Sequence, residues 1–215
     1  MQTQNGEKNM TFKIQKNNLD SFYSSDPKVF AKKYFKYLSK VLQSISATEI
    51  EVFIKSLLEA RKTGASIFFA GNGGSAATAS HFANDIAIGT NDYNIPFKAI
   101  SLSDNNTILT ALGNDFGYDE VFSRQIQVLG KKGDLIVCIS ASGNSPNLIK
   151  AFSSAKSIGI KTIAITAFDG GKMKKLADEG IHVPTEQKEY GPAEDAHMVL
   201  DHLVSGYLMR YIKNG

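Results

Sequence analysis

The 215-residue chain has a single cysteine and no tryptophan. One thiol excludes a disulfide framework within the chain, and Cys138 lies inside an apolar run, so we expect it to be a buried core thiol. No apolar run approaches the roughly 20 residues of a membrane span, and the N-terminus lacks the apolar core of a signal peptide. We therefore expect a cytoplasmic protein without a membrane partner.

An excess of charge of one sign is also lacking. The 24 basic and 21 acidic residues are interspersed and leave a net charge of +3, which is too little asymmetry to predict a nucleic-acid partner. The hydrophobic fraction of 42% is ordinary for a globular protein. A chain of this length fits one domain with a full core, or one domain that carries a helical arm.

The first part of the chain predicts helices that precede a sheet. Residues 1–20 are polar and are expected to be flexible. Apolar residues at helical spacing then predict two amphipathic helices, over residues 26–42 and 47–61. A long apolar helix over residues 194–212 closes the chain. We expect a single domain over residues 21–215 that includes this N-terminal helical arm.

From Ser66 onward, apolar strands alternate with helices. The strands between helices are continuously apolar, which suits a parallel sheet covered on both faces. The pattern predicts an α/β fold, namely a three-layer αβα sandwich around a mainly parallel five-stranded sheet. The predicted strands cover residues 66–70, 97–102, 135–139, 162–166 and 181–183.

Polar clusters follow four of these strands, at residues 72–75, 103–105, 140–145 and 169–171. In open parallel sheets, ligands bind beyond the carboxyl ends of the strands. We therefore expect these four clusters to line one crevice.

The first cluster combines a glycine-rich turn with the start of a helix. Glycines at positions 71, 73 and 74 let the backbone approach an anion closely, and the N–H groups of a helix start point toward it. Further along that helix, His81 and Asp85 are four residues apart and share one face. The segment predicts an anion site followed by two reactive side chains.

Residues 71–76 also match G-x-G-x-x-A, a dinucleotide-binding pattern. That pattern requires an acidic residue about 20 positions further on, which would hold a ribose. Asp104 lies about 30 positions on, within a Ser-Asp-Asn loop that suits sugar hydroxyls better. We therefore expect no nucleotide cofactor.

A serine-rich loop follows the third predicted strand. Pro146 suits the first turn of a helix and Ser145 its N-cap, so the hydroxyls of Ser140, Ser142 and Ser145 gather at the positive end of that helix. Such a loop can hold a phosphate without lysine or arginine, and it can also simply cap a helix. Two loops of this kind in one crevice favour the phosphate site.

These residues together form a recognisable set of motifs. The set includes Gly71 to Ser75, His81-Phe82-Ala83, Gly113 to Gly117, Phe122-Ser123-Arg124, Ser140 to Ser145, Asp169 to Met173, and a closing helix with His197 and His202. From about residue 30 onward, the chain resembles the sugar isomerase (SIS) domain family and, within it, the phosphoheptose isomerases.

The resemblance implies an aldose–ketose isomerase that converts sedoheptulose 7-phosphate to D-glycero-D-manno-heptose 7-phosphate through an enediol, for surface heptose biosynthesis. It also implies a homotetramer whose active sites draw on neighbouring subunits. Substrate contacts would come from Asn72, Gly73, Gly74, Ser75, Asn114, Asp115, Ala141 and Glu194, and phosphate contacts from Ser140, Ser142 and Ser145.

The same resemblance implies an acid/base pair and a zinc ion. Asp85 would be the base and His202 its partner, and the zinc ligands would be His81, Asp85, Glu194 and His202. Without the resemblance, His202 in its apolar run would be read as a core histidine bonded to a carboxylate. His197 lies off the helix face of His202 and is expected either to be structural or to support a site residue from behind, and His182 on the last strand is expected to be a surface residue.

The chain departs from the family pattern at three positions. Asp85 replaces a glutamate, Glu194 a glutamine and Thr90 an arginine. The Asp85 carboxylate is one methylene nearer the backbone, and a misplacement of about 1 Å can cost about a hundredfold in rate. These changes keep two alternatives open: an isomerase of another sugar phosphate, and a non-catalytic phosphosugar-binding regulator of the same fold. His81 and His202 argue against the regulator.

A further constraint concerns Glu194 and His202. Eight residues of helix rise about 12 Å, too far for one ion to bind both side chains on a straight helix. Either Glu194 precedes the regular helix and folds inward, or the two residues serve different sites across a subunit interface.

Overall fold

The computed structural model describes residues 17–214 of the chain. Residues 1–16, most of the segment predicted to be flexible, lie outside the described residues, as does residue 215. The end of that segment begins a short helix, α1 (Asn18–Phe22), whose N-cap is Asn17; the Asn17 side chain accepts a hydrogen bond from the Asp20 backbone N–H. The sequence predicted no element there.

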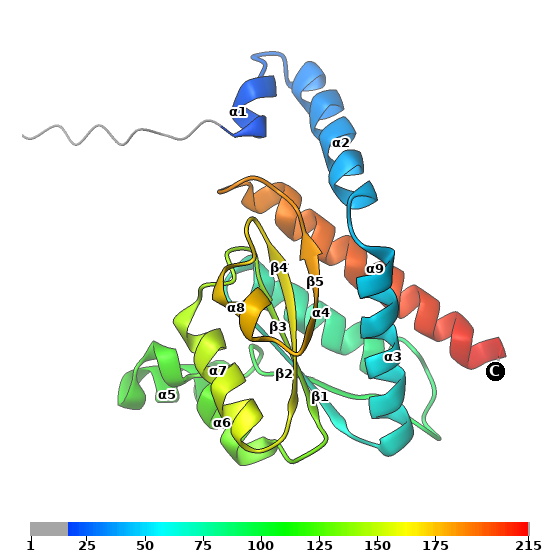
Figure 1. Ribbon diagram of the computed structural model, residues 1–215, viewed down its shortest axis with the longest axis vertical. Helices are drawn as coiled ribbons and strands as arrows, with labels where there is room; N and C mark the ends of the chain where they lie inside the picture. Colours follow the sequence, from blue (N-terminus) through cyan, green and yellow to red (C-terminus); the bar gives the residue numbers. More distant parts are fainter. Residues whose placement is uncertain (1–16, 215) are drawn as a thin grey trace, which may run out of the picture.

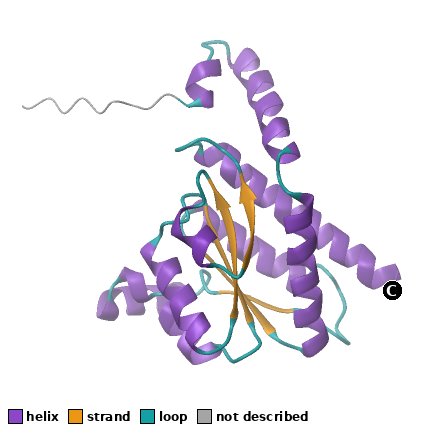
Figure 2. Cartoon of the chain, viewed as in Figure 1, coloured by secondary structure: helices purple, strands orange, loops and turns teal. Residues whose placement is uncertain are grey.

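The predicted five-stranded parallel sheet is confirmed, and its strands lie in the order β2-β1-β3-β4-β5. The strands lie at the centre of the domain, with helices around them (Figure 2). The order reverses at β1, so a topological switch point lies between β1 and β3, where open α/β sheets bind ligands. The strands are β1 (Ser66–Gly71), β2 (Lys98–Ser101), β3 (Leu135–Ser140), β4 (Lys161–Ala167) and β5 (Glu179–Val183).

The central strands are buried along almost their whole length, as their continuously apolar sequence predicted. Strand β2 differs, because its residues alternate between exposed and half-buried. It lies at the edge of the sheet, next to β1 alone. The expectation of full coverage on both faces is therefore wrong for this one strand.

Helices cover both faces of the sheet and complete the three layers (Figure 1). One face packs against α3 (Ala47–Thr63), α4 (Gly74–Ala87) and α9 (Tyr190–Asn214), with Phe53, Phe82 and Leu200 buried in the shared core. The other face packs against α6 (Ser123–Leu129), α7 (Pro146–Ser157) and α8 (Gly171–Leu176), through side chains such as Ile126, Phe152 and Met173. Two further elements, α5 (Asn106–Phe116) and the 3-10 turn η1 (Tyr118–Glu120), precede α6.

The single cysteine is buried in the second of these cores. Burial raises the pKa of the Cys138 thiol, because the charged thiolate would lose its hydration. Cys138 is therefore a core residue, as predicted. Among the helices that the structure describes, none is both long enough and apolar enough to cross a membrane.

Helix α2 (Pro27–Gln43) extends away from the sheet, and Val41 near its end is its one buried residue (Figure 1). Polar contacts hold this arm against the start of α9. The fully buried Glu189 carboxylate accepts hydrogen bonds from the Tyr37 hydroxyl and from the backbone N–H groups of Asn18, at 2.8 Å, and Glu186, at 3.0 Å. The Tyr34 hydroxyl donates to Asp195 at 2.5 Å.

The Tyr37–Glu189 contact predicts a measurable loss of stability. In Tyr37→Phe, a buried carboxylate loses a hydroxyl donor, so the free energy of unfolding should fall by about 1–3 kcal/mol in denaturant melts. Tyr93→Phe is the matched control, because Tyr93 is largely exposed in the loop after α4. Equal stability of Tyr37→Phe and Tyr93→Phe would show that the contact does not hold the arm.

Candidate active site

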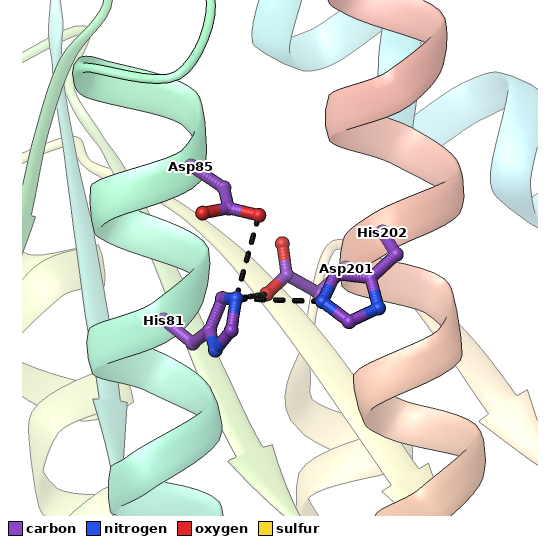
Figure 3. A group of neighbouring side chains, drawn as sticks. All are labelled: His81, Asp85, Asp201 and His202. Carbon is purple, nitrogen blue, oxygen red and sulfur yellow. Dashed lines mark hydrogen bonds and ion pairs between the residues drawn. The ribbon is translucent and has the colours of Figure 1, made fainter.

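Helices α4 and α9 lie side by side and run in the same direction. Gly74 at the start of α4 lies against Glu194 of α9, and two turns further on His81 lies against His202. At this second level four titratable side chains meet, His81 and Asp85 from α4 and Asp201 and His202 from α9 (Figure 3). One ligand atom of each lies within 4.8 Å of the others.

The contacts within this cluster centre on the His81 imidazole. His81 Nε2 lies 3.4 Å from His202 Nε2, 3.5 Å from Asp85 Oδ2 and 4.0 Å from Asp201 Oδ2 (Figure 3). The second Asp85 oxygen, Oδ1, accepts a hydrogen bond from Asn84 Nδ2 at 3.0 Å. Two imidazole nitrogens and two carboxylates thus converge on one small volume.

The cluster is open on one side and closed on the other. The His81 side chain is 43% exposed and that of Asp85 25%, whereas that of Asp201 is fully buried. Among the residues that the structure describes, neither oxygen of Asp201 has a hydrogen-bond partner. Burial, together with the negative charge of Asp85, raises the pKa of Asp201 to about 7.

The donor set fits a divalent cation. Zinc binds imidazole nitrogen and carboxylate oxygen at about 2.0–2.2 Å, so two donors of a tetrahedral site lie about 3.4 Å apart. The His81–His202 and His81–Asp85 separations of 3.4 and 3.5 Å match this value. The Asp201 oxygens, which have no hydrogen-bond partner in the described part of the chain, also support a cation site, because a buried carboxylate needs a counter-charge.

Glu194, predicted as a metal ligand, does not belong to this cluster. Helix α9 begins at Tyr190, so Glu194 lies inside the regular helix. Of the two alternatives for Glu194 and His202, the one in which Glu194 precedes the helix is therefore wrong. Its carboxylate lies against the start of α4, where a Cβ on Gly74 would stand only 2.3 Å from Glu194 Oε2. A side chain at position 74 would therefore displace the Glu194 carboxylate from this place.

Glu194 instead faces the two predicted anion loops. A cavity of about 180 Å³ lies at the switch point between β1 and β3. Several of the residues predicted to bind substrate line it. Gly71 of β1 pairs with Ile139 of β3, so the loops after these strands start at the same level. The lining residues are Asn72, Ser75, Ile139, Ser140, Ala141, Ser142, Ser145, Tyr190 and Glu194.

The serine loop has the geometry of a helix-start anion site. Ser145 occupies the N-cap of α7, yet its hydroxyl makes no capping hydrogen bond, and Pro146 at the next position has no N–H to cap. Ser140 Oγ accepts a hydrogen bond from Gly143 N at 3.1 Å, which fixes the turn. Gly143 has φ +61°, and a Cβ there would collide with the Gly170 carbonyl at 2.0 Å.

Two residues that the sequence analysis missed orient Asn72. Asn72 and Asn147 exchange amide hydrogen bonds of 2.9 Å in both directions, and the Tyr118 hydroxyl donates to Asn72 Oδ1 at 2.9 Å. The Asn72 carbonyl is thereby saturated, and one amide N–H remains for a ligand. Asn147 follows Pro146 directly, but nothing in the sequence indicated which side chain it would meet.

The remaining predicted residues lie elsewhere. Gly73 is the N-cap of α4. Asn114 and Asp115 bond to each other on α5 and are not among the residues that line the cavity. Thr90, which stands where the family pattern has an arginine, is buried, and its hydroxyl donates to the Ile86 carbonyl. His197 is fully buried, and burial lowers its pKa to about 4.

Comparison with known proteins agrees with the resemblance seen in the sequence. The SIS domain family model matches residues 33–167. Phosphoheptose isomerase of Helicobacter pylori is 40% identical over 161 residues, which cover 74% of this chain and 81% of that protein. Phosphoheptose isomerase of Akkermansia muciniphila is 40% identical over 177 residues, covering 82% of this chain and 92% of that protein.

Solved structures give the same result. The structure of phosphoheptose isomerase from Neisseria gonorrhoeae aligns with a TM-score of 0.74 at 30% sequence identity, and it covers 83% of this chain and 96% of that chain. The family model, the sequence identities and the structural match together show that the chain belongs to the SIS domain family and, within it, to the phosphoheptose isomerases.

Proposed function

We propose that this protein isomerises sedoheptulose 7-phosphate to D-glycero-D-manno-heptose 7-phosphate through an enediol. The observation that carries the proposal is the cluster of His81, Asp85, Asp201 and His202, in a chain that belongs to the phosphoheptose isomerases. A phosphosugar-binding regulator needs the loops but has no use for such a cluster. The cluster therefore favours an enzyme.

The cavity at the switch point is proposed to bind the substrate. Hydroxyls of Ser140, Ser142 and Ser145, together with the start of α7, suit the phosphate group. The free amide N–H of Asn72 can donate to a sugar oxygen, and the Glu194 carboxylate can accept from a sugar hydroxyl. The remaining residues proposed to contact substrate are Gly73, Gly74, Ser75, Asn114, Asp115 and Ala141.

Asp85 and His202 are proposed to move the protons. Isomerisation needs a base that takes a proton from the carbon beside the carbonyl and returns it to the neighbouring carbon, and a second group that shifts protons between the two oxygens. Asp85 is suited to the first role because its carboxylate is partly exposed. His202 is suited to the second, since an imidazole can donate and accept near pH 7.

Zinc is the proposed ion, with His81, Asp85 and His202 as ligands. When bound, a divalent ion polarises the substrate carbonyl and stabilises negative charge on its oxygen. Asp85 can serve both as ligand and as base, because a carboxylate has two oxygens and only Oδ2 faces His81. The single buried thiol of Cys138 fits the reducing cytoplasm that we propose as the site of the reaction.

The departures at Asp85 and Glu194 favour one alternative, isomerisation of another sugar phosphate. Both carboxylates lie where a sugar would be handled, Asp85 in the cluster and Glu194 in the cavity. A different sugar would present its hydroxyls to them differently. The heptose phosphate formed in the proposed reaction would serve surface heptose biosynthesis, whereas the product of the alternative reaction would not.

The central test is turnover of sedoheptulose 7-phosphate by the purified protein in the presence of zinc. Asp85→Asn keeps the shape of the side chain but removes the base, so kcat should fall by on the order of a hundredfold or more while KM changes little. His202→Gln should lose activity in the same way.

The control is Glu51→Gln, the same chemical change on an exposed residue of α3 that pairs only with Lys55. It should keep the wild-type rate. Full activity in Asp85→Asn would exclude Asp85 as the base. Wild-type protein that converts a different sugar phosphate and leaves sedoheptulose 7-phosphate untouched would instead support the alternative.

A homotetramer is the proposed assembly. Four side chains at i, i+4 spacing, Val199, Leu203, Tyr207 and Tyr211, form an exposed apolar stripe along α9, next to His202. Helix α5, which carries Asn114 and Asp115, has no buried residue and exposes Phe116. Apolar surface of this kind suits burial against other subunits.

Light scattering should therefore give about four times the 23.4 kDa mass of one chain. Leu203→Glu places a charge in the middle of the stripe and should lower the mass. Val128→Glu is the control, because Val128 on α6 is 82% exposed and lies outside the stripe. A wild-type monomer at micromolar concentration would contradict the proposed assembly.

A further inference from the structure

Asp201 is the one member of the cluster for which neither the sequence motifs nor the resemblance gives a role. Its side chain is fully buried, and within residues 17–214 neither carboxylate oxygen has a hydrogen-bond partner. A buried ionised group without a partner is costly, and native proteins normally pair such a group with an opposite charge or a metal ion. Asp201 is therefore expected to bind a cation.

The protein itself offers no cation to Asp201. Over residues 17–214, neither Asp201 nor Asp85 forms an ion pair with a lysine or arginine; their charged contacts are with the His81 imidazole. The Asp201 carboxylate points toward His81 and Asp85 rather than into the core (Figure 3). A cation that binds Asp201 would therefore lie between the two imidazoles.

Glu194 cannot take this place within one chain. Both acidic residues lie on α9, but seven residues separate them, a rise of about 10 Å. The Glu194 carboxylate lies against Gly74 and lines the substrate cavity, whereas Asp201 Oδ2 lies 4.0 Å from His81 Nε2. The family pattern therefore makes Glu194 a ligand, whereas the structure places Asp201 in the cluster.

We propose that Asp201, and not Glu194, completes the metal-binding donor set of this protein, together with His81, Asp85 and His202. This inference rests on the metal site in the proposed function. It gives two neutral imidazoles and two carboxylates, whose combined charge balances that of a divalent ion. Glu194 is left free to bind the sugar.

Zinc affinity tests this assignment without substrate. Zinc alone is titrated into metal-free protein against a chromophoric chelator, for wild type, Asp201→Asn and Glu194→Gln. Both variants change a carboxylate to an amide on the same helix. Asp201→Asn should weaken zinc binding by about tenfold or more, and Glu194→Gln should leave it within about twofold of wild type.

Three outcomes would overturn the proposal. The first is unchanged zinc affinity in Asp201→Asn. The second is a loss of zinc affinity in Glu194→Gln that equals or exceeds the loss in Asp201→Asn, which would make Glu194 of a neighbouring subunit a ligand. The third is a wild-type protein that binds no zinc. Because no substrate is present, a failure to turn over sedoheptulose 7-phosphate leaves this result standing. The two proposals therefore fail separately.

Thermal unfolding separates a ligand from a structural carboxylate. Without metal, Asp201→Asn removes a buried charge that lies beside Asp85, so its Tm should equal or exceed that of wild type. With saturating zinc the order should reverse, because the wild type gains more from binding. A lower Tm for Asp201→Asn in both conditions would assign Asp201 a purely structural role and overturn the proposal.

Discussion

The site depends on the parallel packing of α4 against α9. Both helices start at the carboxyl edge of the sheet and run in the same direction, and α9 starts about one turn before the level of Gly74. At the first level Gly74 meets Glu194 beside the cavity proposed to bind substrate, and two turns later His81 and Asp85 meet Asp201 and His202. One helix contact therefore positions both the carboxylate proposed to bind the sugar and the cluster proposed to bind the metal.

The charges at the second level support the proposal that it binds a metal ion. Two carboxylates and two imidazoles gather where one carboxylate is fully buried, an arrangement that destabilises the protein unless a cation is held there. The half-exposed imidazole of His81 leaves a route from solvent. The exposed apolar stripe of α9 runs beside this opening, so assembly and catalysis are proposed to meet on one helix.

The sequence predicted the fold well, because apolar strands alternate with amphipathic helices and each pattern has one structural solution. It also placed His81 with Asp85, since i, i+4 spacing fixes a shared helix face. Asp201 was missed because adjacent residues on a helix point about 100° apart, so a cluster containing both Asp201 and His202 has no periodic signal. Which helix would face α4, and at what offset, is set by tertiary packing.

The metal-binding cluster is the central claim, and a crystal grown with zinc tests it most directly. An anomalous difference map at the zinc edge should show one strong peak per chain about 2.0–2.2 Å from donor atoms of His81, Asp85, Asp201 and His202. The Glu194 carboxylate of any subunit should lie outside bonding distance. An empty cluster, or a zinc ion bound through Glu194 in place of Asp201, would contradict this account.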